Sequence, residues 1–297
     1  MNQRPKLPID VHFDTETGDP DDLCTLLLLI AHPAYRLRSV SVTPGTNEQV
    51  GMIKSVLLRC GVGNIPVGSA VPGYDKNCVS KFYYDWLGLF EGMPPEMDSC
   101  SLLLQSLQQW PELTLLTGAP LKGFKNLFET QSIHRWVAQG GFAGDRVVPA
   151  EFRLEKFAGM DICPTYNFNG DVQTAFKLLQ NPNIGERILV SKNVCHGMVY
   201  DRTFHKEMLK MKGIHPAWDL LLRGMGIYLE RHEGGKKFHD PLAAAVAASP
   251  DICTFMEVTM YRKGGGWGSE PSQDSGTWIS ITADREKLIR FLTGAGQ

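Results

Sequence analysis

The densest group of chemically capable side chains in this sequence lies at residues 14–22, which read DTETGDPDD. Five of these nine residues are acidic and none is basic; the acids are Asp14, Glu16, Asp19, Asp21 and Asp22. Carboxylates this close repel one another unless a cation or a shared proton lies between them. Oxygen-rich clusters of this kind suit hard cations such as Ca²⁺ or Mg²⁺. Ordinary helix capping would explain one of these acids but not five.

Three weaker motifs follow later in the chain. Residues 116–120 (LTGAP) form a turn after an apolar segment, and residues 166–171 (YNFNGD) contain two asparagines. Amide side chains both donate and accept hydrogen bonds, which suits sugar hydroxyls, although an Asx turn is the simpler interpretation. The third motif is His239–Asp240–Pro241. Taken alone, Asp240 would cap a helix that has Pro241 at its first position.

The elements that must position these motifs alternate between short apolar strands and longer helices. Strands are expected at 9–13, 37–42, 113–116, 134–137 and 187–190, and helices at 22–31, 47–59, 122–128, 171–179 and 216–229. This order predicts the α/β class, with an open, mostly parallel sheet and helices on both faces. Sites in such sheets form outside the carboxyl ends of the strands.

Two further strands are expected near the end of the chain, at 253–260 and 277–282. The glycine-rich residues 264–276 between them predict a mobile hairpin loop. No change in composition marks a linker, so we expect residues 1–297 to form one domain.

Composition excludes several classes of protein. The 297 residues carry 30 basic and 32 acidic side chains, which argues against binding nucleic acid through bulk charge. No apolar run approaches the ~20 residues that cross a membrane, and no apolar segment typical of a secretory signal follows Met1. Seven scattered cysteines without CxxC spacing are typical of reduced thiols. We therefore expect a cytoplasmic protein whose partner is a small molecule.

Taken together and in this order, the motifs resemble those of the inosine–uridine-preferring nucleoside hydrolase family. That family has an aspartate-rich turn of the DxDxGxDD type, a PTGPLTN-like turn, a GG turn, an EFN-type segment and an HDP motif. The corresponding segments here are DTETGDPDD, LTGAPLKG, the glycines at 140–141, residues 165–167 and HDP at 239–241. The resemblance runs from about residue 8 to about residue 292 and implies the Rossmann-like nucleoside hydrolase fold.

The resemblance implies a Ca²⁺-dependent enzyme that hydrolyses the N-glycosidic bond of a nucleoside or a related ribosyl N-glycoside. Asp21 would be the general base toward a calcium-bound water, and His239 would assist departure of the base. The metal ligands implied are Glu16, Asp22, Asp240 and the main-chain oxygen of Thr117. The substrate-binding residues implied are Asp14, Asn167, Asn169, His239 and either Thr46 or Asn47. The family also implies a homodimer or homotetramer.

Several departures mark the chain as a divergent relative. Glu16 stands where the family usually has Asp, and the spacing from Glu16 to Asp21 differs by one residue. Thr165 replaces the Glu of the EFN segment, and residues 70–95 lack a His-Gly motif. Residues 82–86 (FYYDW) are found there instead. They would form either an aromatic lid over a flat aglycone or, as the helical spacing favours, part of an ordinary buried helix face.

The sequence is also compatible with two other functions. A non-hydrolytic, metal-dependent nucleoside or sugar binder would keep the ligands but would have no use for Asp21 as a base. A Mg²⁺-dependent phosphohydrolase would also place acids after its first strand, but it needs a basic residue for phosphate, and no matching motif follows.

Overall fold

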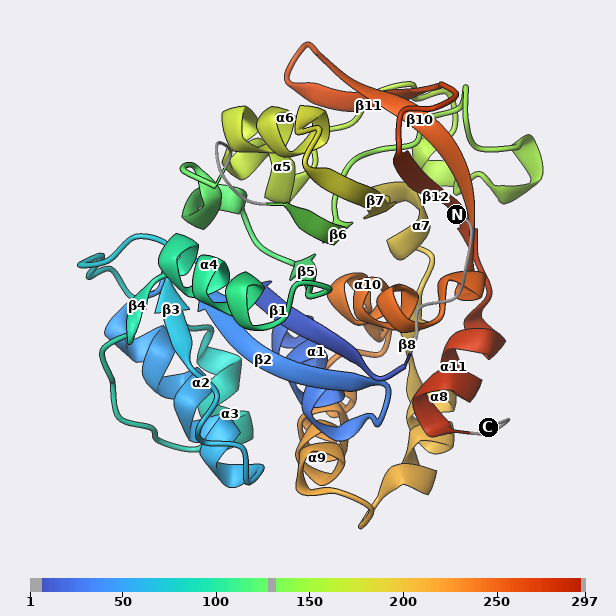
Figure 1. Ribbon diagram of the computed structural model, residues 1–297. Helices are drawn as coiled ribbons and strands as arrows, with labels where there is room; N and C mark the ends of the chain where they lie inside the picture. The colour runs from blue at the N-terminus through green and yellow to red at the C-terminus, as the bar shows by residue number, and fades with distance from the viewer. Residues whose placement is uncertain (1–6, 128–131, 295–297) are drawn as a thin grey trace.

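The computed structural model describes residues 7–127 and 132–294, and Figure 1 shows their arrangement. The strands are β1 (Ile9–Thr15), β2 (Tyr35–Val42), β3 (Val67–Ser69), β4 (Met97–Asp98), β5 (Thr114–Thr117), β6 (Ile133–Gln139), β7 (Ile184–Val190), β8 (Val199–Tyr200), β9 (Lys236–Lys237), β10 (Cys253–Lys263), β11 (Gly266–Pro271) and β12 (Thr277–Ala283).

The α-helices are α1 (Pro20–Ala31), α2 (Asn47–Arg59), α3 (Lys81–Leu87), α4 (Ser99–Gln109), α5 (Tyr166–Gly170), α6 (Val172–Gln180), α7 (Lys192–Cys195), α8 (Arg202–Met208), α9 (Pro216–Arg231), α10 (His239–Ala248) and α11 (Arg285–Thr293). Short 3-10 helices include η1 (Leu121–Phe124) and η3 (Glu155–Phe157). No helix among the described residues is long and apolar enough to cross a membrane.

The main sheet confirms the predicted fold class. Its strand order in the described chain is β11-β10-β12-β7-β6-β5-β1-β2-β3-β4. The pairings from β12 to β4 are parallel, whereas β10 pairs antiparallel with both β12 and β11. The central strands are apolar and buried because helices cover both faces, as a parallel sheet requires.

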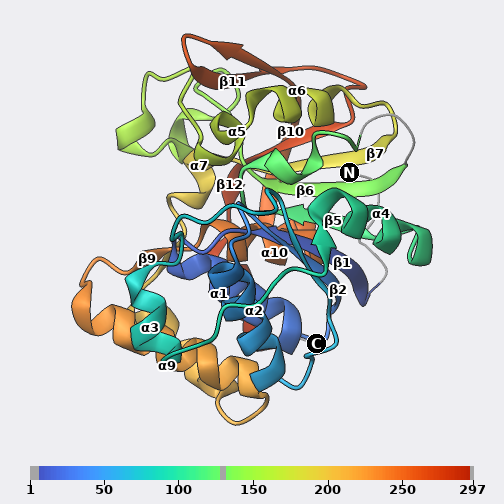
Figure 2. The ribbon, with the colours of Figure 1, turned by 90° about the vertical axis from the view of Figure 1, so that its left-hand side faces the viewer.

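Helices lie on both faces of the sheet (Figures 1 and 2). Apolar side chains pack in two large clusters, one on each face. The adjacent residues Leu115 and Leu116 of β5 belong to different clusters, since successive strand residues point to opposite faces. Helices α1, α2, α9 and α10 contribute to the cluster that contains Leu116, and α4 and α6 to the cluster that contains Leu115. This packing fixes the strand ends that carry the predicted motifs.

Two predictions about local structure are wrong. The helix expected at 122–128 is the short 3-10 turn η1, Leu121–Phe124, and the end of that prediction at Phe128 lies outside the described residues. The glycine-rich residues 264–276 are not simply a loop, because they contain β11, which pairs with β10. Gly264 and Gly265 both have positive φ angles, 56° and 84°, and form the tight turn between these two strands.

The parallel pairing of β1 with β5 brings the first two motifs to one edge of the sheet. Asp14 near the end of β1 is in register with Thr117 at the end of β5. The main-chain N–H of Gly118 donates to the main-chain oxygen of Asp14 at 2.8 Å. Because α10 packs against both α1 and β5, its first residues lie at the same edge.

Candidate active site

The acidic turn connects β1 to α1 and buries most of its carboxylates. Asp19 is the N-cap residue of α1, and its main-chain N–H donates to Asp22 Oδ2 at 3.0 Å. Asp14, Asp21 and Asp22 are only 0%, 2% and 4% exposed. Capping therefore accounts for Asp19 and for part of the bonding of Asp22, but it does not explain the burial of the others.

The start of α10 is bound to the acidic turn. Asp21 Oδ2 accepts hydrogen bonds from the main-chain N–H groups of His239 at 2.9 Å and Asp240 at 3.2 Å. The helix begins at His239 with Phe238 as its N-cap residue, so the interpretation of Asp240 as the cap is wrong. Asp21 instead satisfies the first N–H groups of α10 from another part of the chain.

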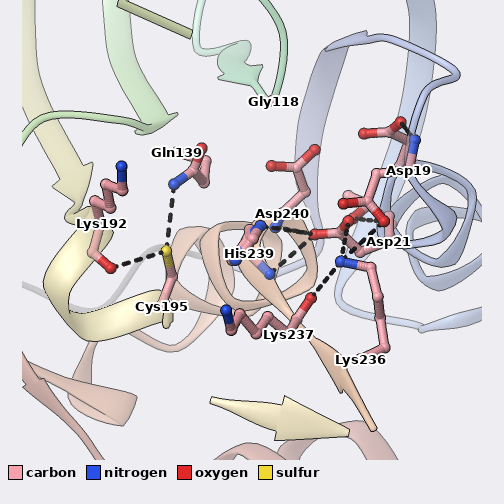
Figure 3. Close-up of polar contacts among 12 residues, drawn as sticks. Asp19, Asp21, Gly118, Gln139, Lys192, Cys195, Lys236, Lys237, His239 and Asp240 are labelled. Atoms are coloured by element: carbon pink, nitrogen blue, oxygen red, sulfur yellow. Dashed lines mark hydrogen bonds and ion pairs between the residues drawn. The ribbon is translucent and has the colours of Figure 1, made fainter. Parts of the chain in front are cut away.

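Lys236 is a site residue that no sequence motif predicts. Its Nζ lies 2.9 Å from Asp19 Oδ1 and 3.0 Å from Asp21 Oδ1, and the side chain is only 5% exposed (Figure 3). Burial alone would lower the pKa of this lysine, but Asp21 and Asp19 outweigh burial and raise it. The same ion pair helps to lower the pKa of Asp21, which burial alone would raise. Asp21 is therefore ionised at neutral pH.

The inner carboxylates have no comparable counter-charge. Neither oxygen of Asp14 has a hydrogen-bond partner among the described residues. Burial raises the pKa of Asp14, the charge of Glu16 adds to the effect, and the nearby Thr43 hydroxyl offsets only part of it. Burial, followed by neighbouring carboxylates, also raises the pKa values of Asp22 and Asp240. Buried carboxylates that crowd together without a counter-charge are costly, and a bound cation would relieve that cost.

The turn after β5 lies directly against one of these acids. A Cβ atom placed on Gly118 would lie 2.2 Å from Asp240 Oδ2, so only glycine permits this approach. The Thr117 hydroxyl accepts a hydrogen bond from Trp136 Nε1 at 3.0 Å. The predicted ligands Asp240 and Thr117 are thus neighbours in space although far apart in sequence.

Glu16 is directed toward a different neighbour. Its Oε2 accepts a hydrogen bond from the Tyr166 hydroxyl at 3.2 Å, and burial is the main cause that raises its pKa to about 7. Within the described ranges, the group whose ligand atoms all lie within 4.8 Å of one another is Asp19, Asp21 and His239. The Lys236 ammonium already lies between the two carboxylates of that group. A metal there would have to displace the lysine, so we favour the inner carboxylates.

The predicted sugar-binding residues fall into two groups. Asn167 is buried, and its Nδ2 donates to the main-chain oxygens of Gly118 at 3.1 Å and Gln139 at 3.0 Å. This fixes Asn167 beside the turn after β5. Asn169 instead donates to the main-chain oxygen of Gly265 at 2.8 Å and accepts from the N–H of Thr165 at 3.2 Å. Its amide is therefore engaged in joining two segments of the chain.

The two candidates after β2 differ in exposure. Thr46 is buried and caps α2, because its hydroxyl accepts from the main-chain N–H of Gln49 at 3.1 Å. Asn47 is exposed at the first position of α2. Capping occupies Thr46, whereas the side chain of Asn47 is accessible.

His239 lies beside Asp21 with one ring nitrogen unpaired. Its Nδ1 is 3.8 Å from Asp21 Oδ2, and its Nε2 is buried without a hydrogen-bond partner among the described residues. Burial lowers the pKa of His239 to about 4, so the ring is neutral at pH 7. Its ring centroid lies 5.0 Å from that of His196, a residue that no sequence motif predicts either. The only sequence signal for His196 is its position shortly after β7.

The aromatic segment 82–86 belongs to α3. Trp86 is fully buried, as the helical interpretation predicts, and its Nε1 donates to the main-chain oxygen of Leu220 at 2.8 Å. The buried face is shared by Tyr83 rather than by Phe82, which is only half-buried. The Tyr83 hydroxyl donates to the main-chain oxygen of Asp19. This helix therefore supports the acidic turn from outside.

Comparison with solved structures identifies the fold. A plant nucleoside hydrolase matches with a TM-score of 0.71 and 16% identity, covering 96% of this chain and 98% of that one. A purine-preferring ribonucleoside hydrolase from Gardnerella vaginalis matches with a TM-score of 0.66 and 16% identity, covering 96% of both chains. An inosine–uridine-preferring nucleoside hydrolase from Bacillus anthracis matches with a TM-score of 0.66 and 19% identity, covering 96% of this chain and 98% of that one.

No family model matches the sequence, and no curated protein matches it either. The chain therefore has the nucleoside hydrolase fold over nearly its whole length, with a sequence far from those of the solved structures. The resemblance predicted from the motifs is confirmed at the level of the fold.

Proposed function

We propose that the protein is a Ca²⁺-dependent hydrolase of the N-glycosidic bond in a nucleoside or a related ribosyl N-glycoside. The observation that carries this proposal is the buried carboxylate of Asp14, which lies beside the buried Asp22 and Asp240. Its two oxygens have no hydrogen-bond partner in the part of the chain that the structure describes. A site for a cation and a sugar explains this unpaired charge, and the fold is one that nucleoside hydrolases share. We also propose that residues 1–297 act as one such domain.

The residues that would hold the metal are Glu16, Asp22, Asp240 and the main-chain oxygen of Thr117. Carboxylate and carbonyl oxygens are the ligands that Ca²⁺ prefers. When bound, the ion would orient the sugar hydroxyls and make a water molecule more acidic. The raised pKa values of Asp22 and Asp240 support this ligand set, because a bound cation would relieve the repulsion between them.

Asp21 is the residue we assign as general base. Lys236 and the N–H groups at the start of α10 hold its carboxylate in one orientation. The lysine also keeps Asp21 ionised, so that it can accept a proton at neutral pH. A positioned base of this kind contributes on the order of 10²–10⁴-fold to rate.

His239 is the residue we assign to the leaving base. Its neutral ring carries a buried Nε2 that lacks a protein partner in the described part of the chain. A hydrogen bond from this ring to the departing base would stabilise the negative charge that develops as the glycosidic bond breaks. Asn167, fixed beside the turn after β5, would accept a hydrogen bond from a sugar hydroxyl at its Oδ1.

The test is chromatographic detection of free base from a panel of nucleosides in the presence of Ca²⁺. We expect turnover by the native chain, and Asp21→Asn should lower kcat by about 10²–10⁴-fold. Calorimetry of Ca²⁺ binding should distinguish the proposed metal ligands from the other acids of the turn. We expect Asp240→Asn to weaken Ca²⁺ binding and Asp19→Asn to retain it. The hydrolase proposal fails if Ca²⁺ binds and no N-glycoside in the panel is cleaved.

A second candidate is a metal-dependent nucleoside or sugar binder without turnover. Lys236 favours it, because an ion pair with Asp21 makes that carboxylate less basic. A protein described as an effector shares the fold, with a TM-score of 0.60 and 16% identity over 98% of this chain. Tight nucleoside binding by calorimetry with no base released over hours would decide for the binder.

A further inference from the structure

Three lysines from separate segments surround His196 and His239. Lys156 lies in η3, Lys192 is the first residue of α7, and Lys237 lies in β9. The Lys156 ammonium contacts His196 Nδ1, and the His196 ring stacks obliquely on His239 at 5.0 Å between centroids. Figure 3 shows the ammonium ends of Lys192 and Lys237 on one side of His239, with Asp19 and Lys236 on the other.

These lysines are not balanced by acids. In the chain as described, none of the three has a carboxylate within ion-pair distance. The Lys237 charge lies near enough to the Lys156 ammonium to disfavour it, and neither ammonium can accept a hydrogen bond from the other. Burial, the Lys237 charge and the Lys192 charge together lower the pKa of Lys156. Like charges held this close favour an anion between them.

His196 adds a neutral donor to the same place. An ammonium has no acceptor, so His196 Nδ1 must accept from Lys156, and the ring proton is then on Nε2. Burial and the surrounding positive charges lower the pKa of His196 to about 3, which agrees with a neutral ring. Lys192 is anchored by its bond to the main-chain oxygen of Pro164 at 2.7 Å, which fixes the position of its charge.

We propose that Lys156, Lys192, Lys237 and His196 form a subsite for an anionic group that the substrate carries on its leaving base. The inference rests on the proposed function, which assigns His239 to the leaving base. A carboxylate fits best, because a planar anion next to His239 could accept from the Nε2–H of the His196 ring while the nearby ammonium groups offset its charge. The substrate class is then an N-riboside of an acidic heterocycle rather than of a neutral one.

Matched substrates test this proposal directly. Nicotinic acid riboside is compared with nicotinamide riboside, and orotidine with uridine, because each pair differs by a carboxylate on the base. Inosine 5′-monophosphate and inosine form a third pair, in which the anion is a phosphate on the sugar. We expect a higher kcat/KM for the carboxylate member of the first two pairs and no such preference in the third. A preference confined to the phosphate pair would overturn the assignment to the base.

Lysine variants test whether these side chains cause the preference for acidic substrates. Lys156→Met and Lys237→Met should each reduce the acidic-to-neutral ratio of kcat/KM by roughly two- to fivefold, and the reduction should shrink in high salt. The matched control is Lys206→Met, an exposed lysine of α8 outside the cluster. The subsite is excluded if neutral substrates turn over and the ratio is the same in the native chain and both variants.

A binding measurement separates this inference from the proposed function. Calorimetry with free nicotinic acid and free nicotinamide needs no turnover. Tighter binding of the acid, lost in the Lys156→Met/Lys237→Met double variant, would support the subsite even in a chain that cleaves nothing. Equal binding of the two compounds would overturn it.

Discussion

Strand β1 carries two buried polar side chains, and the structure treats them in opposite ways. His12 and Asp14 are both 0% exposed and, being two residues apart on a strand, point to the same face. Both ring nitrogens of His12 have partners, with Nδ1 2.7 Å from the hydroxyl oxygen of Ser39 and Nε2 2.7 Å from that of Ser41. Neither oxygen of Asp14 has a partner among the described residues.

The difference between His12 and Asp14 depends on where each residue lies along β1. His12 lies inside it, where β2 supplies hydroxyls from the next strand, and burial keeps the ring neutral by lowering its pKa to about 3. Asp14 lies close to the carboxyl end, where the chain turns and further acids gather. A buried polar group that the protein satisfies itself is structural, whereas one left unsatisfied points to a ligand. We therefore propose that the same strand contributes to stability at His12 and to function at Asp14.

Of the changes predicted here, removing Ca²⁺ should alter the free energy of unfolding the most. At a concentration 100 times its dissociation constant, the ion should stabilise the folded chain by about 2.7 kcal/mol. Urea unfolding with Ca²⁺ or with a chelator measures this increment. His12→Leu should keep the increment and Asp240→Asn should lose it, because only the second removes a proposed ligand. An increment of equal size in both variants would contradict the ligand assignment.

Asp14→Asn should weaken Ca²⁺ binding or activity by about 10–100-fold, the usual cost of losing a group that supports a metal site. Without metal, the same variant should be as stable as the native chain or more stable, because it removes a buried, unpaired carboxylate. Calorimetry and urea unfolding measure the two effects. Full Ca²⁺ affinity together with a large loss of stability would show instead that Asp14 is structural.

His12→Leu should give the reverse result. Removing the ring takes one hydrogen-bond partner from each of the buried hydroxyls of Ser39 and Ser41, at a cost of about 1–3 kcal/mol for each group left unsatisfied. Ser39 also contacts the Ser106 hydroxyl at 2.7 Å, which should moderate the loss. We expect lower stability by urea unfolding and near-native kcat. A large loss of kcat in a His12→Leu chain that still folds would contradict the structural role assigned to His12.

The pH dependence of stability should be the smallest of these effects. The pKa of His12 falls from 6.5 to about 3 on folding, so only the unfolded chain gains a proton between these values. The contribution of His12 is therefore complete above pH 6.5 and is lost as pH falls, at up to about 1.4 kcal/mol per pH unit. Asp14 acts oppositely in the metal-free protein, because its raised pKa makes stability fall as pH rises through that pKa.

Comparing the native chain with His12→Gln and Asp14→Asn at several pH values separates these two contributions. The difference in unfolding free energy between the native chain and His12→Gln should narrow as the pH falls below 6.5. The same difference for Asp14→Asn, measured without metal, should change with pH in the opposite sense. Parallel curves for both variants would contradict the assigned protonation states.

Periodic patterns predicted most of the fold. The helix expected at 47–59 is α2, Asn47–Arg59. The alternation of strands and helices correctly predicted a mostly parallel sheet. The prediction failed where the signal was compositional. Glycine-rich residues 264–276 looked like a loop, but Gly264 and Gly265 supply only the turn, and the buried Trp267 belongs to β11.

The acids of the site were visible in the sequence, but their partners were not. Lys236 stands in a polar run that resembles a solvated loop, and only the pairing of β9 with β8 carries it into the acidic turn. Asp240 looked like a helix cap because its sequence neighbours suit that role, yet Asp21 supplies the cap from more than 200 residues away. Long-range partners of this kind leave no periodic signal.

The sequence by itself determined the order of strands and helices and the crowding of carboxylates after the first strand, because both depend on near neighbours in the chain. Only the tertiary structure decided which carboxylates are paired. Asp21 and Asp19 share the Lys236 ammonium, whereas Asp14 is buried without a hydrogen-bond partner across residues 7–127 and 132–294. The physical reason is that the energy of a buried charge depends on what surrounds it in space, and those surroundings come from distant segments.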